Sequence, residues 1–290
     1  MENDRLIIPF VKMTGAGNDF VLIDNLEQQL QLDWSAFASA VCNRRYGIGA
    51  DGLLVIEKST VADFTMNYFN ADGSYGGMCG NGGRCSSKYV MGISNLHKIR
   101  FNALDYIYEA EKSSTQVKLH MKNPSSIKTN IQLAINVIDL SAYFINTGSP
   151  HVVVALHQQS AKLKDEIHRN GIIGIGRAIR NHSNFSPHGT NVNFTEITEN
   201  SVVSMRTYER GVEDETLACG TGAVASAICV SQLSNISSPV TIKTRSNEFL
   251  KVYFQKDGEQ FSSVILEGPA IEVFRGYLHY SLNNNKILPK

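Results

Sequence analysis

Neither sign of charge is in excess in this sequence. Its 290 residues contain 27 Lys and Arg against 27 Asp and Glu, so the formal net charge is zero. Without a basic surplus, no long-range field draws the protein to nucleic acid or to an anionic membrane. No apolar run approaches the ~20 residues that a membrane-spanning helix needs, and the start Met-Glu-Asn-Asp-Arg is unlike the basic start of a signal peptide. We therefore expect a soluble, cytoplasmic protein with no nucleic-acid or membrane partner.

Cysteine is scarce, and its spacing suggests no pairs. The five cysteines are Cys42, Cys79, Cys85, Cys219 and Cys229. An odd number in a chain without an export signal argues against a disulfide framework. No CxxC pair occurs, and Cys79 and Cys85 lack the spacing and the His partners of a structural zinc site, so we expect no metal. Cys42, Cys85 and Cys229 lie in apolar or helical contexts typical of small core residues, which leaves Cys79 and Cys219.

A Cys-Gly-x-Gly turn occurs twice, at Cys79 and at Cys219, 140 positions apart. Other landmarks share this offset: Gly49-Ala-Asp51 matches Gly189-Thr-Asn191, and Tyr68 matches Tyr208. Landmarks in the same order at one offset indicate one structural unit used twice. The length agrees, because a chain of this size is expected to form roughly two domains of ~150 residues.

Strands dominate the predicted secondary structure of both halves. We expect strands at residues 7–13, 20–24, 53–56, 64–69, 99–121, 151–154, 191–197, 202–208, 249–254, 263–266 and 271–280. Helices are expected at 34–45, from Cys79 to a stop at Gly92, within 161–180, and after Cys219. The regular βαβ alternation of a doubly wound sheet is missing, which favours an α+β fold. Pro124 and the polar stretch 125–130 predict a linker between the domains.

The two turns offer the same chemistry. A helix N-terminus presents unpaired N–H groups and a partial positive charge, and it stabilises the thiolate of a cysteine placed there. The glycines let a ligand approach the backbone, whose N–H groups can bind a carboxylate. Two such turns facing each other across a cleft would place one sulfur on each face of an amino-acid α-carbon. One thiolate would remove the proton and the opposite thiol would return one, which inverts the configuration.

At these residues the chain resembles the diaminopimelate epimerases. The motifs that carry the resemblance are Gly17-Asn18-Asp19-Phe20, Asn70-Ala-Asp-Gly-Ser74, Cys79-Gly-Asn-Gly-Gly-Arg84, Ser149-Pro-His151, Glu209-Arg210-Gly211 and Ala218-Cys219-Gly-Thr-Gly222. The resemblance covers nearly the whole chain and implies a cofactor-independent, two-thiol epimerase that interconverts LL- and meso-diaminopimelate on the route to lysine and peptidoglycan. It also implies a homodimer, and two pseudo-symmetric α+β domains, each a curved sheet around a central helix, with the site in the cleft between them. We expect residues 1–122 with 277–290 in the first domain and 123–276 in the second.

Residue by residue, the resemblance makes Cys79 and Cys219 the acid/base pair. The backbones of Gly80, Asn81, Gly220 and Thr221 would hold the carboxylate at the reacting centre. Asn18, Asn70, Asn191 and Arg210 would bind the substrate, several of them at its distal end, where an arginine can hold a carboxylate with two parallel bonds. Glu209 and His151 match positions near the reacting centre, where they would orient the substrate or tune a thiol.

Two positions depart from the family pattern, and two other functions remain open. Gly52 stands where some members carry a substrate-binding Gln, and Ser149 replaces the usual Asn before Pro-His; both affect substrate choice.

A proline or hydroxyproline racemase also uses two cysteines, but there Gly-His usually replaces Gly80-Asn81. A redox-sensing or binding protein could use facing thiols as a reversible disulfide, but gives Asn70, Asn191 and Arg210 no role.

Overall fold

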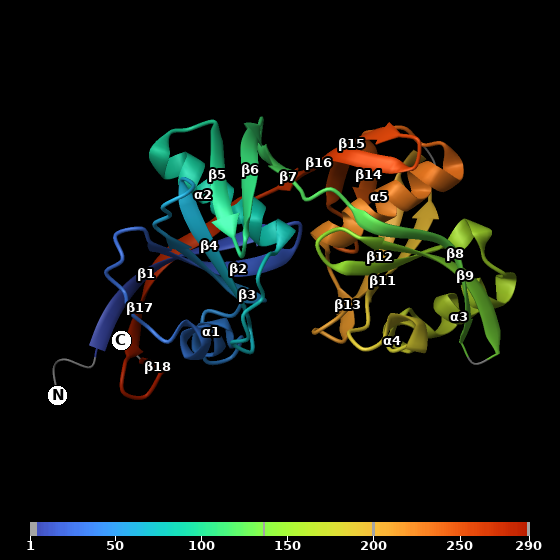
Figure 1. Ribbon diagram of the computed structural model, residues 1–290. Coiled ribbons are helices and arrows are strands. Elements are labelled where there is room, and N and C mark those ends of the chain that lie inside the picture. Colours follow the sequence, from blue (N-terminus) through green and yellow to red (C-terminus); the bar gives the residue numbers. More distant parts are fainter. Residues whose placement is uncertain (1–4, 136, 199–200, 289–290) are drawn as a thin grey trace. The chain divides into compact units, whose positions relative to one another are not determined.

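A computed structural model describes residues 5–135, 137–198 and 201–288 of an α+β protein. The contacts within the chain divide it into two compact units (Figure 1). Unit 1 comprises Met1–Leu119 and Gly268–Lys290, and unit 2 comprises His120–Glu267. The sequence sets the second division after residue 276, but the structure sets it earlier, because strand β17 pairs with β1 from Ile271 onward.

Unit 1 contains a mixed sheet with two helical crossovers. Its strands are β1 (Arg5–Gly15), β2 (Asn18–Asn25), β3 (Gly52–Glu57), β4 (Phe64–Asn70), β5 (Lys98–Ala103), β6 (Tyr106–Ser113), β17 (Ile271–Ser281) and β18 (Lys286–Leu288), and β7 (Gln116–His120) leads out of the unit. The pairings run β18–β17–β1–β2–β3–β4–β5–β6. Only β2–β3 and β4–β5 are parallel, and a parallel pair needs a crossover. Helices α1 (Trp34–Cys42) and α2 (Gly80–Ser94) supply the two crossovers.

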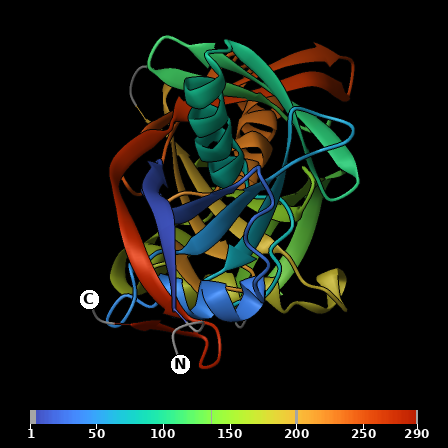
Figure 2. The same ribbon diagram turned by 90° about the vertical axis from the view of Figure 1, so that its left-hand side faces the viewer.

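The helices of unit 1 begin and end at identifiable caps. Asp33 caps α1 by accepting hydrogen bonds from the N–H groups of Ser35 and Ala36. Helix α1 ends at Cys42, short of the expected residue 45. Helix α2 runs past Gly92 to Ser94 and ends at Asn95, which takes a left-handed conformation and donates its N–H to the Met91 carbonyl. Figure 2 shows α2 in the middle of the unit with strands around it.

Unit 2 repeats this plan. Its strands are β8 (Ser125–Ile135), β9 (Ile138–Asn146), β10 (Pro150–Ala155), β11 (Asn191–Ile197), β12 (Val203–Glu209), β13 (Asp214–Thr216), β14 (Val240–Lys243), β15 (Phe249–Asp257) and β16 (Gln260–Pro269). Between them lie η2 (Leu156–Gln158), α3 (Ala161–Asn170), α4 (Ile173–Arg180), η3 (Ser183–Phe185) and α5 (Gly220–Ser234). The expected linker at 125–130 is wrong: these residues begin β8, which pairs with β9.

The two units share one order of strands. In unit 1 the pairings along β17–β1–β2–β3–β4–β5–β6 are antiparallel twice, then parallel, antiparallel, parallel and antiparallel. In unit 2 the pairings along β8–β9–β10–β11–β12–β14–β15 follow the same series. Helices α2 and α5 each have 15 residues, and each ends at a left-handed asparagine, Asn95 or Asn235. The repeat predicted from the 140-residue offset is therefore a repeat of structure.

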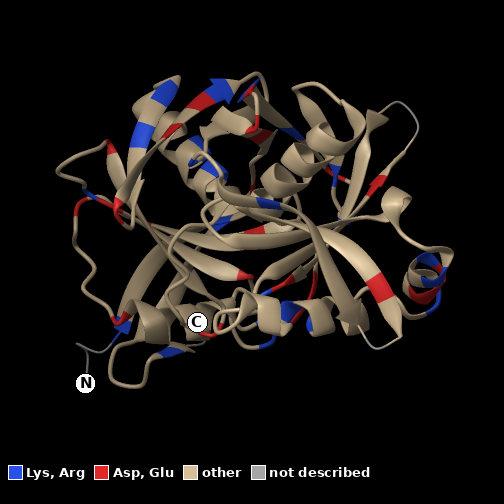
Figure 3. Cartoon of the chain, turned by 45° about the vertical axis from the view of Figure 1, so that its right-hand side comes forward, with Lys and Arg blue, Asp and Glu red and all other residues tan. Residues whose placement is uncertain are grey.

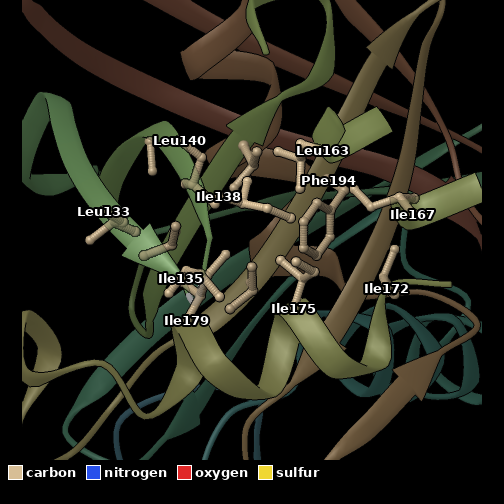
Figure 4. Close-up of a cluster of buried hydrophobic side chains, with 14 of the residues drawn as sticks. Leu133, Ile135, Ile138, Leu140, Leu163, Ile167, Ile172, Ile175, Ile179 and Phe194 are labelled. Carbon is tan, nitrogen blue, oxygen red and sulfur yellow. The ribbon is translucent and has the colours of Figure 1, made fainter. Parts of the chain in front are cut away.

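The core of unit 2 lies between its sheet and the helices α3 and α4. Leu163 and Ile167 of α3, and Ile175 and Ile179 of α4, pack with Phe194 of β11 (Figure 4). Helix α5 is buried along most of its length and contacts β10, β11 and β12. This burial fixes the start of α5, and so Cys219, against the ends of these strands.

No helix among the described residues is both long and apolar enough to cross a membrane. Lys and Arg residues are interspersed with Asp and Glu residues along the chain (Figure 3), in line with the balanced composition.

Candidate active site: two cysteine turns

Cys79 is the residue that caps the N-terminus of α2. Its backbone is extended, and its sulfur accepts a hydrogen bond from the Gly82 N–H at 3.4 Å. The helix starts at once, because the Gly83 N–H donates to the Cys79 carbonyl at 2.7 Å. A Cβ on Gly82 would lie 2.9 Å from Leu54 Cδ2 and 3.4 Å from Cys79 Cβ, so glycine lets the turn lie close to β3. The sulfur thus lies at a helix N-terminus, as predicted.

A chain of amides leads from Cys79 to a buried arginine. The Cys79 thiol donates to Asn18 Oδ1 at 3.7 Å, and Asn81 Nδ2 donates to the same oxygen at 3.2 Å. Arg84 donates to Asn81 Oδ1 at 2.8 Å and to the Gly80 carbonyl at 3.4 Å. Arg84 is fully buried, and burial lowers the pKa of its guanidinium. Because arginine nevertheless keeps its proton in proteins, a positive charge lies within the first turns of the helix that Cys79 starts.

An ionic network continues from Asn18 toward the surface. Asn18 Nδ2 donates to Asp51 at 2.7 Å, and Arg44 bridges Asp51 and Asp19 at 2.7 Å each. Lys12 pairs with Asp19 at 2.7 Å and donates to the Gly49 carbonyl. Burial raises the pKa of Asp19, but hydrogen bonds from Arg44 and Lys12 outweigh it and lower that pKa to about 2. Asn18 is thus held by charged groups on the side away from the thiol.

Asn70, the last residue of β4, lies opposite Gly52 of β3. Its side chain donates to Ser74 Oγ at 2.9 Å. The glycine at position 52, where some family members carry a glutamine, has a steric reason. A Cβ there would lie 2.5 Å from the Tyr68 ring and 2.6 Å from the Phe69 carbonyl. The ring of Tyr68 fills the space that a glutamine at 52 would need.

Cys219 caps α5 with almost the same backbone as Cys79, and a hydroxyl lies beside its sulfur. Its sulfur lies 3.6 Å from the Thr221 hydroxyl. The Thr221 carbonyl accepts a bond from Thr147 at 3.0 Å, which ties the helix start to the turn before β10. Position 224, 140 residues after Arg84, is a buried valine.

His151 is fully buried and lies behind Thr221, which is partly exposed. Its Nε2 lies 2.8 Å from the Thr221 hydroxyl and 2.9 Å from the Ser149 hydroxyl. Its Nδ1 lies 3.0 Å from Asn193 Nδ2. Burial, with the field of Arg210, lowers the pKa of His151 to about 3, so the ring is neutral near pH 7. Ser149, which replaces the usual asparagine, reaches both His151 and Thr221, to which it donates at 3.2 Å.

The side chain of Asn191 is hydrogen-bonded to the backbone of Arg210. Asn191 starts β11 beside His151 of β10, and its Oδ1 accepts the Arg210 N–H at 2.9 Å. The Arg210 guanidinium donates to the His188 carbonyl at 3.4 Å. Glu209, the last residue of β12, lies opposite Asp214 of β13.

Within unit 1 the structure therefore brings together Asn18, Cys79, Gly80 and Asn81, whereas the side chain of Asn70 bonds to the nearby Ser74. Within unit 2 it brings together Ser149, His151, Cys219, Gly220 and Thr221, with Asn191 and Arg210 as a second group. No sequence motif predicted a role for Arg84, for Asn193, or for Thr207, whose hydroxyl bonds to Asn193. The sequence does contain a signal for Asn193: it lies two residues after Asn191, so both side chains are expected on the same face of a strand.

The other three cysteines are core residues, as predicted. Cys42, Cys85 and Cys229 are buried, and burial raises the pKa of Cys42 and of Cys85 to about 12 and raises that of Cys229 as well. Their thiols stay protonated in the neutral range.

Comparison with known proteins identifies the family. The family model described as diaminopimelate epimerase matches residues 10–118 and 143–273. The diaminopimelate epimerase of Chlorobaculum tepidum is 44% identical over 91% of this chain and 98% of its own length, and that of Aquifex aeolicus is 39% identical over 93% and 97%. In fold, the chain is similar to a hydroxyproline epimerase from Agrobacterium vitis, with a TM-score of 0.71 at 12% identity over 93% and 92% of the two chains. It is also similar to a Bacillus anthracis protein of the PhzF family, with a TM-score of 0.69 at 14% identity over 94% and 99%.

Proposed function

Because the chain belongs to the diaminopimelate epimerase family of isomerases, we propose that it interconverts LL- and meso-2,6-diaminopimelate. In this proposal Cys79 and Cys219 act on opposite faces of the α-carbon: one thiolate removes the proton and the other thiol returns one. The observation that carries the proposal is the repeated turn, in which each of two like units starts a 15-residue helix at a cysteine.

The weak acidity of the α C–H is the main obstacle, because the reaction would run without a cofactor that delocalises charge. Fixed dipoles must stabilise the carbanion. The first turns of α2 and α5, through the N–H groups of Gly80, Asn81, Gly220 and Thr221, would hold the adjacent carboxylate at two positive helix ends. Closure of the two units over the substrate would exclude water and strengthen these dipoles.

The remaining site residues would hold the substrate. Asn18, Asn70 and Asn191 offer amides, and Arg210 offers a charged fork that suits the distal carboxylate. Glu209 would orient the substrate near the reacting centre. His151 and Ser149 would act from behind Thr221, as their hydrogen bonds suggest.

The cellular role follows from the same proposal. The partner of this chain would be a small-molecule amino-acid substrate, and the reaction would serve lysine and peptidoglycan precursor synthesis in the cytoplasm. We propose a homodimer on the basis of the family alone.

One experiment tests substrate class and mechanism together. The reduced protein is incubated in D2O with LL-diaminopimelate, and with L-proline in a parallel sample, while NMR follows the α-proton. The proposal predicts loss of the diaminopimelate α-proton signal together with appearance of the meso isomer. The Cys79→Ala/Cys219→Ala double variant gives the background.

Two results would contradict the proposal. Exchange on proline alone would move the protein to the racemases. No exchange on either substrate, in protein shown to be folded and reduced, would leave the thiols without this chemistry and favour a redox role.

A further inference from the structure

We propose that Asn193 holds His151 as the tautomer protonated on Nε2, and that the hydroxyl of Thr221 consequently donates its proton to the sulfur of Cys219. Asn193 would then be a positioning residue that favours the thiolate of Cys219 through two intermediate groups. This inference rests on the proposed function only for its use in catalysis, since the hydrogen bonds lie within unit 2 and need no substrate.

The orientation of the Asn193 amide is fixed by two partners. Its Nδ2 lies 3.2 Å from the Val152 carbonyl, which can only accept a hydrogen bond. Its Oδ1 accepts the hydroxyl of Thr207 at 2.9 Å. The amide nitrogen therefore faces both Val152 and His151, and its second hydrogen points at His151 Nδ1, 3.0 Å away.

This orientation sets the tautomer of the histidine. A nitrogen that accepts a hydrogen bond carries no proton, so Nδ1 is bare. His151 is fully buried and neutral near pH 7, because burial and the field of Arg210, the charged side chain that acts on it, lower its pKa to about 3. Its single proton must then lie on Nε2, which faces Thr221 and Ser149.

The proton on Nε2 sets the direction of the next bond. Whichever hydroxyl His151 donates to, Thr221 Oγ1 receives a hydrogen bond, either from Nε2 directly or from Ser149, which donates to it at 3.2 Å. Its own proton is then free to point at Cys219 Sγ, 3.6 Å away. A donor aimed at sulfur stabilises the charged thiolate over the neutral thiol.

The packing indicates that this arrangement is specific. Asn193 and His151 are fully buried and Thr207 nearly so. Asn193 approaches α5 so closely that a Cβ on Gly222 would lie 2.4 Å from its Oδ1. The second glycine of the turn thus makes room for the amide.

The first readout is the tautomer itself. In protein with 15N-labelled histidine, NMR distinguishes a protonated from an unprotonated ring nitrogen, and the His151→Gln variant assigns the signals. We expect wild-type His151 to carry its proton on Nε2. In Asn193→Asp, whose carboxylate can only accept, we expect a proton on Nδ1. A wild-type spectrum with the proton on Nδ1 would overturn the proposal.

The second readout is the reactivity of Cys219. In a Cys79→Ala background, alkylation by iodoacetamide is measured against pH. Cys219 is 6% exposed, whereas the three core cysteines are at most 2% exposed and burial raises the pKa of their thiols. We expect Thr221→Val and Asn193→Asp to raise the pH midpoint of the alkylation rate by about one unit, since a hydrogen bond to a charged group is stronger than one to its neutral form. Thr221→Ser, which keeps the hydroxyl, should react like the parent. An unchanged midpoint in Thr221→Val would refute the donation to sulfur.

The controls separate this idea from general damage and from the proposed function. Thr195→Val changes a buried hydroxyl two residues further along β11 that has no hydrogen-bond partner among the described residues, and both readouts should stay at the wild-type values. If Asn193→Asp does not fold, Thr207→Val weakens the same amide and should move the midpoint in the same direction. Neither readout requires turnover, so an inactive enzyme with the expected tautomer would contradict the function and leave the relay intact.

Discussion

The hydrogen bonds behind Cys79 lead to charged side chains, whereas those behind Cys219 lead to a neutral histidine and an amide. Behind Cys79 lie the buried Arg84 and, through Asn18, the ionic network of Asp51, Arg44, Asp19 and Lys12. Behind Cys219 lie Thr221, Ser149, His151 and Asn193, with Val224 in the place of Arg84.

This difference shows that a repeated backbone does not require repeated electrostatics. The helix start is the same in both units, and it supplies the N–H groups that any anion there would use. The groups behind the helix start then differ. In unit 1 a buried arginine, Arg84, lies in the helix that Cys79 starts, and in unit 2 the hydroxyl of Thr221 connects His151 with the sulfur of Cys219. The predictions below test whether the two turns are equivalent in function and different in electrostatics.

The largest effect should come from removing either thiol. If both are needed, Cys79→Ala and Cys219→Ala should each lower the epimerisation rate by ~1,000-fold or more, since a single positioned acid or base contributes 10²–10⁴-fold. The assay is conversion of LL- to meso-diaminopimelate. Cys85→Ala and Cys229→Ala, buried on the same two helices, are the matched controls and should stay active. Full turnover in either of the first two variants would end the two-thiol mechanism.

Acid should weaken unit 2 before unit 1. His151 has a native pKa of about 3 against 6.5, so its contribution to stability is complete above pH 6.5 and is lost as pH falls toward 3, with a slope of up to about 1.4 kcal/mol per pH unit. Asp19, with a native pKa of about 2 against 3.8, keeps its contribution above pH 3.8 and loses it only as pH falls toward 2.

Denaturant unfolding at a series of pH values checks this order. The slope between pH 6.5 and 4 should be steeper in the wild type than in His151→Gln. Equal slopes would show that His151 is not buried as a neutral ring.

The two turn glycines should respond unequally to alanine. Gly222→Ala places a Cβ 2.4 Å from Asn193 Oδ1, whereas Gly82→Ala meets the flexible end of Leu54 at 2.9 Å. Overpacking costs about 1–3 kcal/mol, and alanine in a helix recovers up to about 1 kcal/mol. We expect Gly222→Ala to lower the unfolding free energy clearly and Gly82→Ala to change it by less than about 1 kcal/mol. The reverse ranking would show that Asn193 yields more easily than Leu54.

The smallest effect should come from the surface end of the ionic network. The Arg44 side chain is 59% exposed, and exposed ion pairs contribute at most about 1 kcal/mol. Arg44→Ala should therefore cost less than about 1 kcal/mol at low salt, and still less at high salt because salt screens exposed charges. A loss that persists at high salt would mean that Arg44 acts through packing.

Local sequence signals predicted much of the fold, including most strands and the starts of the helices at Asp33, Cys79 and Cys219. They failed where the signal was not local. Residues 125–130 look like a linker because they are polar, yet they pair with β9, and a partner strand is invisible to composition. Gly92 looks like a helix stop, but α2 continues to Asn95, whose left-handed conformation ends the helix.

The candidate site was predictable as a set of residues and not as a network. The cysteines, the glycines and Asn18 are visible as motifs. The role of Asn193 depends on the register between β10 and β11, which places its amide on the Val152 carbonyl and His151. The reason for Gly52 likewise depends on Tyr68 of the neighbouring strand. Contacts between strands decide both, and no short motif records them.

The position of β17 has a consequence for the order of events during synthesis. Unit 2 is one continuous segment, whereas unit 1 needs β17, the first strand of its series, from the far end of the chain. Domains fold as they emerge from the ribosome, so unit 2 can be complete while β1 still lacks its neighbour. Arg84 also lacks one of its hydrogen-bond partners until then, because its Nε donates to the Pro269 carbonyl at 3.5 Å. The surroundings of Cys219 can therefore form first, and those of Cys79, although encoded earlier, become complete only when residues 268–281 have been made.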